Sequence, residues 1–276
     1  VCCDSNKNLR VGSDSKDDAL HANVATIKDA FYSPEMNKIR KQFLNNERPN
    51  ICSTCWKRED MGIASLRIAM NGRFADNINS LNLKEPKLKY LDIKYDNKCN
   101  LACRMCSAGS SDQHQKELLI QVNDGKRIPN HFDYGEYENN NKYKKELSHR
   151  LSSHAEKPFL EQDVISALPE LEVLKVTGGE PTVNHKFLNA VDYAIKNDYA
   201  KNIVLDLTTN GTKFNTDLLE KISHFKFCRF RISIDGTGKI YDYIRYPFNW
   251  DMLNKSVNLM FSHFKEKEYL QNRVSV

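Results

Sequence analysis

From residue 87 onward the chain alternates short apolar strands with amphipathic helices, and this alternation constrains the fold more than any other feature. Four strands are predicted, at residues 88–95, 171–176, 203–207 and 228–234. The helices between them repeat apolar residues at helical spacing, as at Phe187, Val191 and Ile195. Such alternation is typical of an α/β fold with a parallel sheet, open or closed into a barrel.

The composition is that of a globular chain with a substantial core, because 40% of the 276 residues are hydrophobic and 28% are charged. The formal net charge of +5 is mild for this length, so we expect no nucleic-acid partner. No apolar run is long enough to span a bilayer, and no signal-peptide pattern opens the chain. Seven of the eight cysteines fall in tight clusters, which favours metal sites over disulfides and predicts a reducing, cytoplasmic location.

The sequence predicts two parts. Residues 1–85 form a small cysteine-rich module, in which Ser33 and Pro34 mark the start of a helix. Residues 86–276 hold the strands and helices, interrupted at about 108–158 by a polar insertion with a helix expected at 112–122. This insertion is either a surface excursion or a substrate-contacting element. The chain begins at Val1 and ends on residues that alternate like a fifth strand from 273, so we expect a fragment.

Three cysteines, Cys99, Cys103 and Cys106, lie within eight residues directly after the first predicted strand. Functional sites of parallel α/β folds gather at the carboxyl ends of the strands. A structural zinc site prefers four protein ligands in two pairs. Three thiolates spaced Cys-x-x-x-Cys-x-x-Cys fit better a 4Fe–4S cluster with one iron left open for a ligand that is not protein.

This loop resembles the signature of the radical S-adenosylmethionine (radical SAM) superfamily. The resemblance implies a partial (β/α)6 barrel, cut here near its fifth strand. It also implies that the open iron chelates S-adenosylmethionine. Reduction of the cluster would then cleave the cofactor to a 5′-deoxyadenosyl radical that abstracts hydrogen from a substrate, with Cys99, Cys103 and Cys106 holding the catalytic cluster.

The ends of the other strands add further matches to the family. The resemblance implies that they contact S-adenosylmethionine through Gly178, Gly179, Glu180, Pro181, Asn210, Ser233 and Arg245. The pattern Ser-x-Asp-Gly with a later Arg resembles the peptide-modifying branch, and an arginine suits a carboxylate because its planar fork binds both oxygens. Ser107 departs from the family, which often has an aromatic residue directly after the third cysteine.

Strand phase assigns the two faces of the sheet independently of the resemblance. Cys228, Phe230 and Ile232 are expected to pack under helices, with Cys228 a buried core residue. The opposite face would be a polar barrel lumen that carries Asp92, Lys94, Lys175, Thr177, Asp206, Thr208, Arg229, Arg231 and Ser233. We hypothesise that some of these charges contact the substrate.

The cysteines of the first part are Cys2, Cys3, Cys52 and Cys55. By spacing alone, a zinc site and an iron–sulfur site are about equally compatible with them. Their context resembles the auxiliary-cluster modules called SPASM and twitch, which implies an auxiliary 4Fe–4S cluster. Such modules usually carry a further cysteine upstream of the Cys-Cys pair, and this sequence starts too late to show one.

Together these features predict a radical SAM oxidoreductase that modifies a peptide and takes an electron from a donor such as flavodoxin or ferredoxin, with no membrane partner. Two alternatives stay open. The substrate could be a sugar, a nucleotide or another small molecule. The protein could also be a redox-sensing or structural metalloprotein rather than an enzyme, since fold-level analogy is weak on function.

Overall fold

The computed structural model describes residues 26–75, 85–123 and 158–266. The chain separates into two compact units, Val1–Leu88 and Lys89–Val276. The expected fifth strand from residue 273, Cys2, Cys3 and most of the polar insertion lie outside the described residues. No helix in the described part of the chain is long and apolar enough to cross a bilayer.

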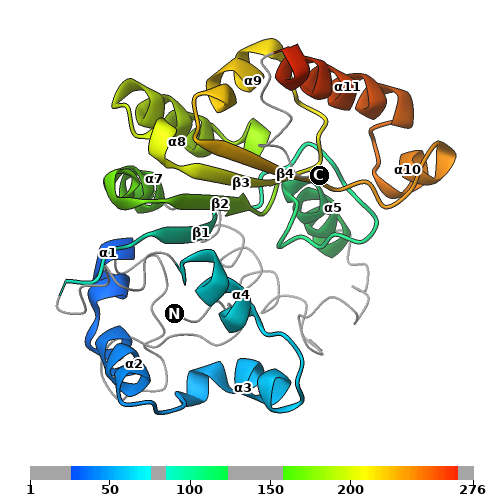
Figure 1. Cartoon of the computed structure of the whole chain (residues 1–276). Helices are drawn as coiled ribbons and strands as arrows, with labels where there is room; N and C mark the ends of the chain where they lie inside the picture. Colours follow the sequence, from blue (N-terminus) through cyan, green and yellow to red (C-terminus); the bar gives the residue numbers. More distant parts are fainter. Residues whose placement is uncertain (1–25, 76–84, 124–157, 267–276) are drawn as a thin grey trace. The chain divides into compact units, whose positions relative to one another are not determined.

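The larger unit is built on a parallel four-stranded sheet in the order β1-β2-β3-β4 (Figure 1). The strands are β1 Tyr90–Lys94, β2 Val173–Thr177, β3 Val204–Thr209 and β4 Phe227–Ile232. Each predicted strand is confirmed, with its ends within two residues of those expected from the sequence. Successive strands are therefore spatial neighbours joined by crossovers.

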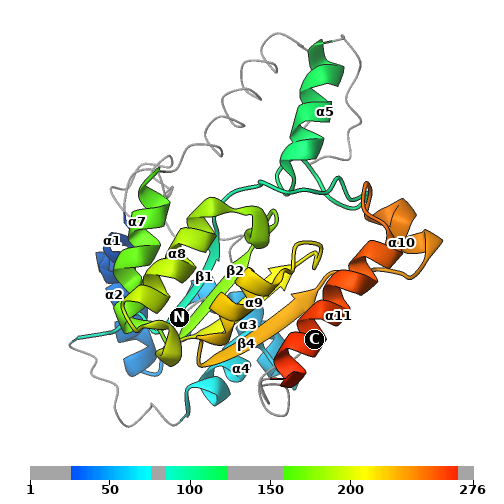
Figure 2. The same ribbon diagram turned by 90° about the horizontal axis from the view of Figure 1, so that it is seen from above.

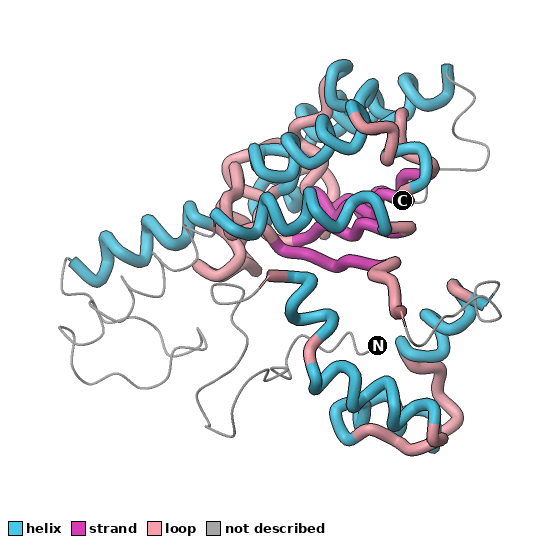
Figure 3. Tube along the Cα trace, turned by 90° about the vertical axis from the view of Figure 1, so that its left-hand side faces the viewer, coloured by secondary structure: helices cyan, strands magenta, loops and turns pink. Residues whose placement is uncertain are grey.

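Helices cover one face of this sheet, as Figures 2 and 3 show. They are α7 Pro158–Ala167, α8 His185–Lys196, α9 Thr216–Ser223 and α11 Trp250–Glu266. Parallel strands in sequential order with these helices on one side are typical of a barrel, whereas a doubly wound sheet has helices on both sides. The unit is thus an α/β fold consistent with part of a radical SAM barrel.

Shorter elements connect the strands and helices. The 3₁₀ turns are η3 Leu168–Glu170, η4 Pro181–Val183 and η5 Ala200–Asn202. Helix α10 Lys239–Ile244 follows β4, and α5 Asp112–Asn123 confirms the helix expected at 112–122. Asn184 and Asn215 cap α8 and α9, each accepting a hydrogen bond from a backbone N–H of the first turn.

The core lies between the sheet and these helices. Leu205, Leu207 and Phe230 are fully buried on the helix-covered face. Phe230 packs against Phe214 of the β3–α9 connection and Phe264 of α11, with ring centroids 5.5 and 5.6 Å apart. Cys228 is buried on the same face, as predicted.

The opposite face is polar, which confirms the face assignment made from strand phase. In the register, Asp92 pairs with Lys175, Lys175 with Asp206, and Asp206 with Arg229. Lys175 Nζ lies 2.6 Å from Asp92 Oδ2, and Arg229 and Arg231 both form ion pairs with Asp206. One face of the sheet therefore builds the core, and the other presents charge.

The smaller unit is helical where it is described. Its elements are α1 Ile27–Tyr32, α2 Pro34–Leu44, η1 Asn50–Cys52, α3 Ser53–Asp60 and α4 Leu66–Arg73. Ser33 caps α2 and Pro34 opens it, as predicted. Trp56 donates its indole N–H to the Pro49 carbonyl at 3.1 Å, and the Arg67 guanidinium stacks 4.2 Å from the ring centroid.

We expect Phe230→Ala to lower the free energy of unfolding by about 3–5 kcal/mol, because it opens a cavity between the sheet and α11. Urea denaturation followed by circular dichroism measures the change. The control is Phe261→Ala on α11, where the side chain is 37% exposed, with an expected cost of about 1 kcal/mol or less. Equal costs for the two variants would contradict this description of the core.

Candidate active site

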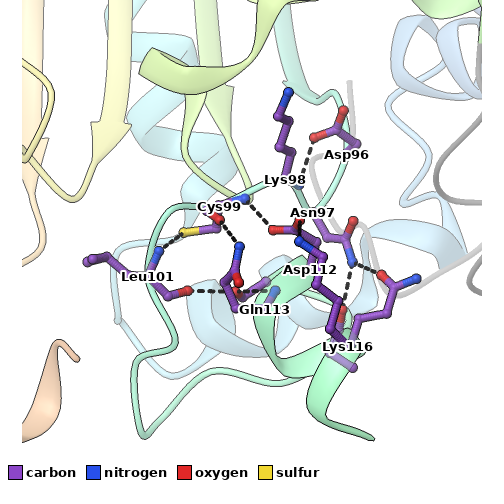
Figure 4. A network of polar contacts seen from close by, with 11 residues as sticks. Asp96, Asn97, Lys98, Cys99, Leu101, Asp112, Gln113 and Lys116 are labelled. Carbon is purple, nitrogen blue, oxygen red and sulfur yellow. Dashed lines mark hydrogen bonds and ion pairs between the residues drawn. The ribbon is translucent and has the colours of Figure 1, made fainter. Parts of the chain in front are cut away.

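The cysteine loop begins five residues after β1 and is held by the first turn of α5 (Figure 4). The Cys99 N–H donates to Asp112 Oδ1 at 2.9 Å, and Gln113 Nε2 donates to the Cys99 carbonyl at 3.2 Å. Lys116 pairs with the other oxygen of Asp112 at 3.0 Å. The helix dipole favours an acidic residue in the first turn of a helix. Asp112 occupies this position in α5 and, through its carboxylate, also holds the backbone of Cys99.

Buried polar groups close the base of the same loop. Asn97 donates to the Ala108 carbonyl at 2.8 Å and to Gln115 Oε1 at 2.6 Å. Ser111, which is 1% exposed, donates its hydroxyl to the Leu101 carbonyl at 2.6 Å. Because buried backbone carbonyls need partners, these side chains determine the path of the loop.

The other side of the loop pairs with the segment that contains Arg245. The N–H groups of Ala102 and Arg104 donate to the carbonyls of Tyr246 and Ile244, at 2.8 and 2.9 Å. The Arg104 guanidinium also lies 4.1 Å from the Tyr243 ring centroid. The cysteine loop and this distant segment therefore form one structural piece.

The three thiols have different surroundings. Cys103 Sγ accepts hydrogen bonds from the Cys106 thiol and, at 3.5 Å, from Arg245 Nη1, and these donors lower the pKa of Cys103 to about 6. Cys99 Sγ accepts from the Leu101 N–H at 3.4 Å and from Asn210 Nδ2 at 3.9 Å, but burial raises its pKa to about 11. The pKa of Cys106 is raised, mainly because its thiol donates to Cys103. Two of the three sulfurs thus already face donors that would stabilise thiolates.

These residues fit a 4Fe–4S cluster. Three thiolates from one loop can each bind a different iron atom of a cubane. Beside Cys103, Arg245 is 8% exposed, and its Nε is buried without a hydrogen-bond partner among the described residues. A buried orphan donor of this kind suits an anionic ligand such as the carboxylate of S-adenosylmethionine.

The turn after β2 presses directly against the cysteine loop. Gly179 has φ +52°, and a Cβ on it would lie 2.3 Å from the Lys98 carbonyl oxygen. The next N–H, of Glu180, donates to that oxygen at 2.8 Å. Gly178 has φ +80° and makes room for the stem of Lys94, whose Nζ reaches the Gly109 carbonyl at 2.6 Å. Only glycine suits this combination of backbone conformation and close approach.

Glu180 lies at the junction between the ends of β2 and β3. Its side chain is buried and accepts hydrogen bonds from Thr182 N, Thr182 Oγ1, Thr209 Oγ1 and Asn210 N at 2.6–3.1 Å. Burial raises the pKa of Glu180, although these hydrogen bonds oppose the effect. The carboxyl thereby ties the end of β2 to the end of β3, and the neighbouring Pro181 opens η4 Pro181–Val183.

Asn210, at the end of β3, connects that strand to the cysteine loop. Its Nδ2 donates to Asn100 Oδ1 at 2.9 Å, and its Oδ1 accepts from the N–H and the hydroxyl of Thr212. Asn100 in turn donates to the Thr212 hydroxyl at 2.8 Å. Asn210 is thus placed beside Cys99.

The end of β4 joins the site through Arg245. The Ser233 N–H donates to the Thr209 carbonyl at 2.9 Å. Asp235, with φ +60°, forms an ion pair with Arg245. The structure therefore brings Arg245 and Cys103 together by a side-chain contact, whereas Ser233 is placed next to β3 through its backbone.

The sequence analysis assigned no role to several residues that support the cysteine loop in the structure. They are Asn97, Asn100, Arg104, Asp112 and Gln113, and of these only Asp112 carried a local signal, since it opens the helix expected at 112–122. The sequence placed Lys94 on the polar face and Asp235 in the Ser-x-Asp-Gly pattern, but not their contacts with Gly109 and Arg245. Cys52 and Cys55 lie in the smaller unit, Cys52 buried in η1 and Cys55 in the first turn of α3.

We expect Gly179→Ala to reduce iron loading on anaerobic reconstitution, because the added Cβ would displace the Lys98 carbonyl and the cysteine loop with it. The matched control is Gly62→Ala, since Gly62 has φ +72° with nothing within 4 Å of an added Cβ. Both variants bear the backbone cost of about 1–2 kcal/mol for a left-handed alanine. Iron content per folded chain separates them, and loading of Gly179→Ala at the level of Gly62→Ala would refute the role given to this contact.

Comparison with known proteins agrees with this geometry. The chain is similar to the mycofactocin maturase MftC of Mycobacterium tuberculosis (strain CDC 1551 / Oshkosh), with 32% identity over 94 residues, 33% of this chain and 23% of that protein. The MftC of Mycobacterium ulcerans (strain Agy99) is 33% identical over 87 residues, 30% of this chain and 22% of the relative. These matches span less than a quarter of the relatives' length. Residues 93–265, more than half of the chain, match the radical SAM superfamily. The chain therefore belongs to the radical SAM superfamily, which implies a 4Fe–4S cluster and S-adenosylmethionine as its cofactors.

Proposed function

We propose that this protein is a radical SAM enzyme that oxidises or cross-links a peptide. The observation that carries the proposal is the cysteine loop itself, held at the carboxyl ends of the strands by α5, Asn210 and the Arg245 segment. This loop lies inside the region that matches the superfamily. When bound, the cluster and S-adenosylmethionine supply a 5′-deoxyadenosyl radical.

The residues of the chain orient and shield this chemistry. The Leu101 N–H and Asn210 amide point at Cys99, and the Arg245 guanidinium points at Cys103. Hydrogen bonds and a cation at thiolate sulfurs stabilise their negative charge and tune the reduction potential of a cluster. Asp235 holds the Arg245 side chain in place, and Arg245 Nε remains a buried donor without a partner among the described residues. This donor would bind the carboxylate of S-adenosylmethionine and so position the cofactor.

The proposal of a peptide substrate is supported by three separate observations. Ser233, Asp235, Gly236 and Arg245 resemble the pattern of the peptide-modifying branch. The relatives with 31–33% identity are named maturases. The polar face of the sheet offers charged side chains for a substrate of this kind.

The smaller unit is proposed to hold an auxiliary 4Fe–4S cluster. Cys52 ends η1 and directly precedes α3, and Cys55 follows three residues later in the first turn of that helix. Cys2 or Cys3 would supply a further ligand. A flavodoxin or ferredoxin is the proposed electron donor.

We expect Cys99→Ala, Cys103→Ala and Cys106→Ala each to abolish the formation of 5′-deoxyadenosine, because each removes one of three cluster ligands. The reconstituted full-length protein is incubated with S-adenosylmethionine and dithionite, and products are measured by liquid chromatography and mass spectrometry. Cys228→Ala is the control, since Cys228 is a buried core residue on the helix-covered face. The enzyme proposal fails if the unsubstituted protein loads only zinc and releases no 5′-deoxyadenosine.

The double variant Cys52→Ala/Cys55→Ala is expected to load about half as much iron as the unsubstituted protein, since one of two cubanes is lost. It should retain reductive cleavage of S-adenosylmethionine, because the three cysteines of the other loop are untouched. Iron and sulfide analysis checks this outcome. Unchanged iron content would exclude an iron–sulfur cluster at these two cysteines.

A further inference from the structure

The polar sheet face, defined as Asp92, Lys175, Asp206, Arg229 and Arg231, is not balanced in charge. Asp92 and Lys175 form a one-to-one pair at 2.6 Å. Asp206 instead faces two arginines, with Arg229 Nη1 3.5 Å and Arg231 Nη2 3.0 Å from Oδ2, and a second contact between Arg231 Nη1 and Oδ1. The Asp206 carboxylate therefore pairs with two guanidinium groups, and the five residues of the polar sheet face carry a net charge of about one positive unit.

Burial separates the roles of the three side chains. The Asp206 side chain is 1% exposed, whereas those of Arg229 and Arg231 are 34% and 45% exposed. A buried carboxylate needs partners, and the two arginines supply them from the neighbouring strand. Asp206 is thus a fixed anchor under two cations that still reach solvent.

The two guanidinium groups keep donors to spare. Each arginine has five N–H donors in a planar fork. In the described part of the chain, Arg231 donates two of them to Asp206 and Arg229 donates one. Arginines fixed in this way lose little conformational entropy when they bind a second anion, because the first has already ordered them.

Arg231 also stands next to the cofactor site. It lies on β4 two residues before Ser233, which directly follows the strand and donates its N–H to the Thr209 carbonyl of β3. The two positions therefore share a face and are about 6–7 Å apart along the chain. The cations therefore face the same side as the strand ends expected to hold S-adenosylmethionine. A ligand on them would be presented to the radical rather than held at a remote surface.

We propose that Arg229 and Arg231 form a carboxylate-binding site that orients the substrate, with Asp206 as the residue that positions both. This proposal rests on the proposed peptide-modifying function and adds that the enzyme selects a peptide by one of its carboxylate groups. The carboxylate is either an acidic side chain of the peptide or its free C-terminus. A substrate group without negative charge would leave the surplus positive charge unpaired.

Arginine modification of the full-length, cluster-loaded protein tests the site without turnover. Phenylglyoxal labelling of each arginine is mapped by mass spectrometry in the presence of three probes: acetyl-Gly-Glu-Gly-amide, acetyl-Gly-Gln-Gly with a free carboxyl, and acetyl-Gly-Gln-Gly-amide. We expect one or both carboxylate probes to protect Arg229 and Arg231, and the neutral amide to protect neither. The probe that protects identifies the source of the carboxylate. Arg48 is the internal control, because it pairs one to one with Asp60 and should label equally throughout.

The affinity of variants for the protecting probe is a second, independent test of the carboxylate site. Arg231→Gln/Asp206→Asn removes the bidentate donor without leaving a buried charge unpaired, and we expect it to bind the protecting probe at least about tenfold more weakly. Arg231→Lys should weaken binding less, since it keeps the charge but loses the planar fork. Arg48→Gln/Asp60→Asn is the matched control and should bind the probe as the unsubstituted protein does.

The proposal is overturned if no carboxylate probe protects the two arginines. It is also overturned if the neutral amide protects as well as its charged counterparts. Formation of 5′-deoxyadenosine is measured on the same samples. If the carboxylate probes protect the arginines but no 5′-deoxyadenosine forms, the proposed enzyme function is refuted and the anion site stands. If 5′-deoxyadenosine forms but no probe protects the arginines, the anion site is refuted and the enzyme function stands.

Discussion

The contact between Gly179 and the carbonyl of Lys98 is the constraint on which the rest of the site depends. A side chain at residue 179 would meet that oxygen at 2.3 Å, so β2 and the cysteine loop can come together only through a bare backbone. The Glu180 N–H then satisfies the same carbonyl at 2.8 Å. Because Cys99 follows Lys98 directly, this contact sets where the first thiol stands relative to the strand ends.

Glu180 extends that constraint from β2 to β3. Burying a carboxyl is costly unless it is fully hydrogen-bonded, and Glu180 receives four hydrogen bonds from residues 182, 209 and 210. Asn210 is thereby held with its amide toward Asn100 and Cys99. A residue that resembles a cofactor ligand thus also acts as a brace that places another one.

The sheet divides its work between two faces. Leu205, Leu207 and Phe230 pack against the helices. The alternate residues of the same strands, Asp206, Arg229 and Arg231, lie on the polar side. This separation follows from the alternation of side chains along a strand. The same four strands can therefore build an apolar core on one face and present a charged surface on the other.

The sequence by itself determined the strands, the main helices, the two faces of the sheet and the grouping of the cysteine loop with Asn210 and Arg245. Each of these follows from a periodic pattern or from a motif at a strand end. Tertiary structure alone decided that Glu180 turns into the protein, that Lys94 passes Gly178 to reach Gly109, and that Asp112 clamps Cys99. These contacts join residues 13–30 positions apart through hydrogen bonds that leave no periodic trace. Their partners are set only when the loops close over the strand ends and each buried polar group must find a donor or acceptor.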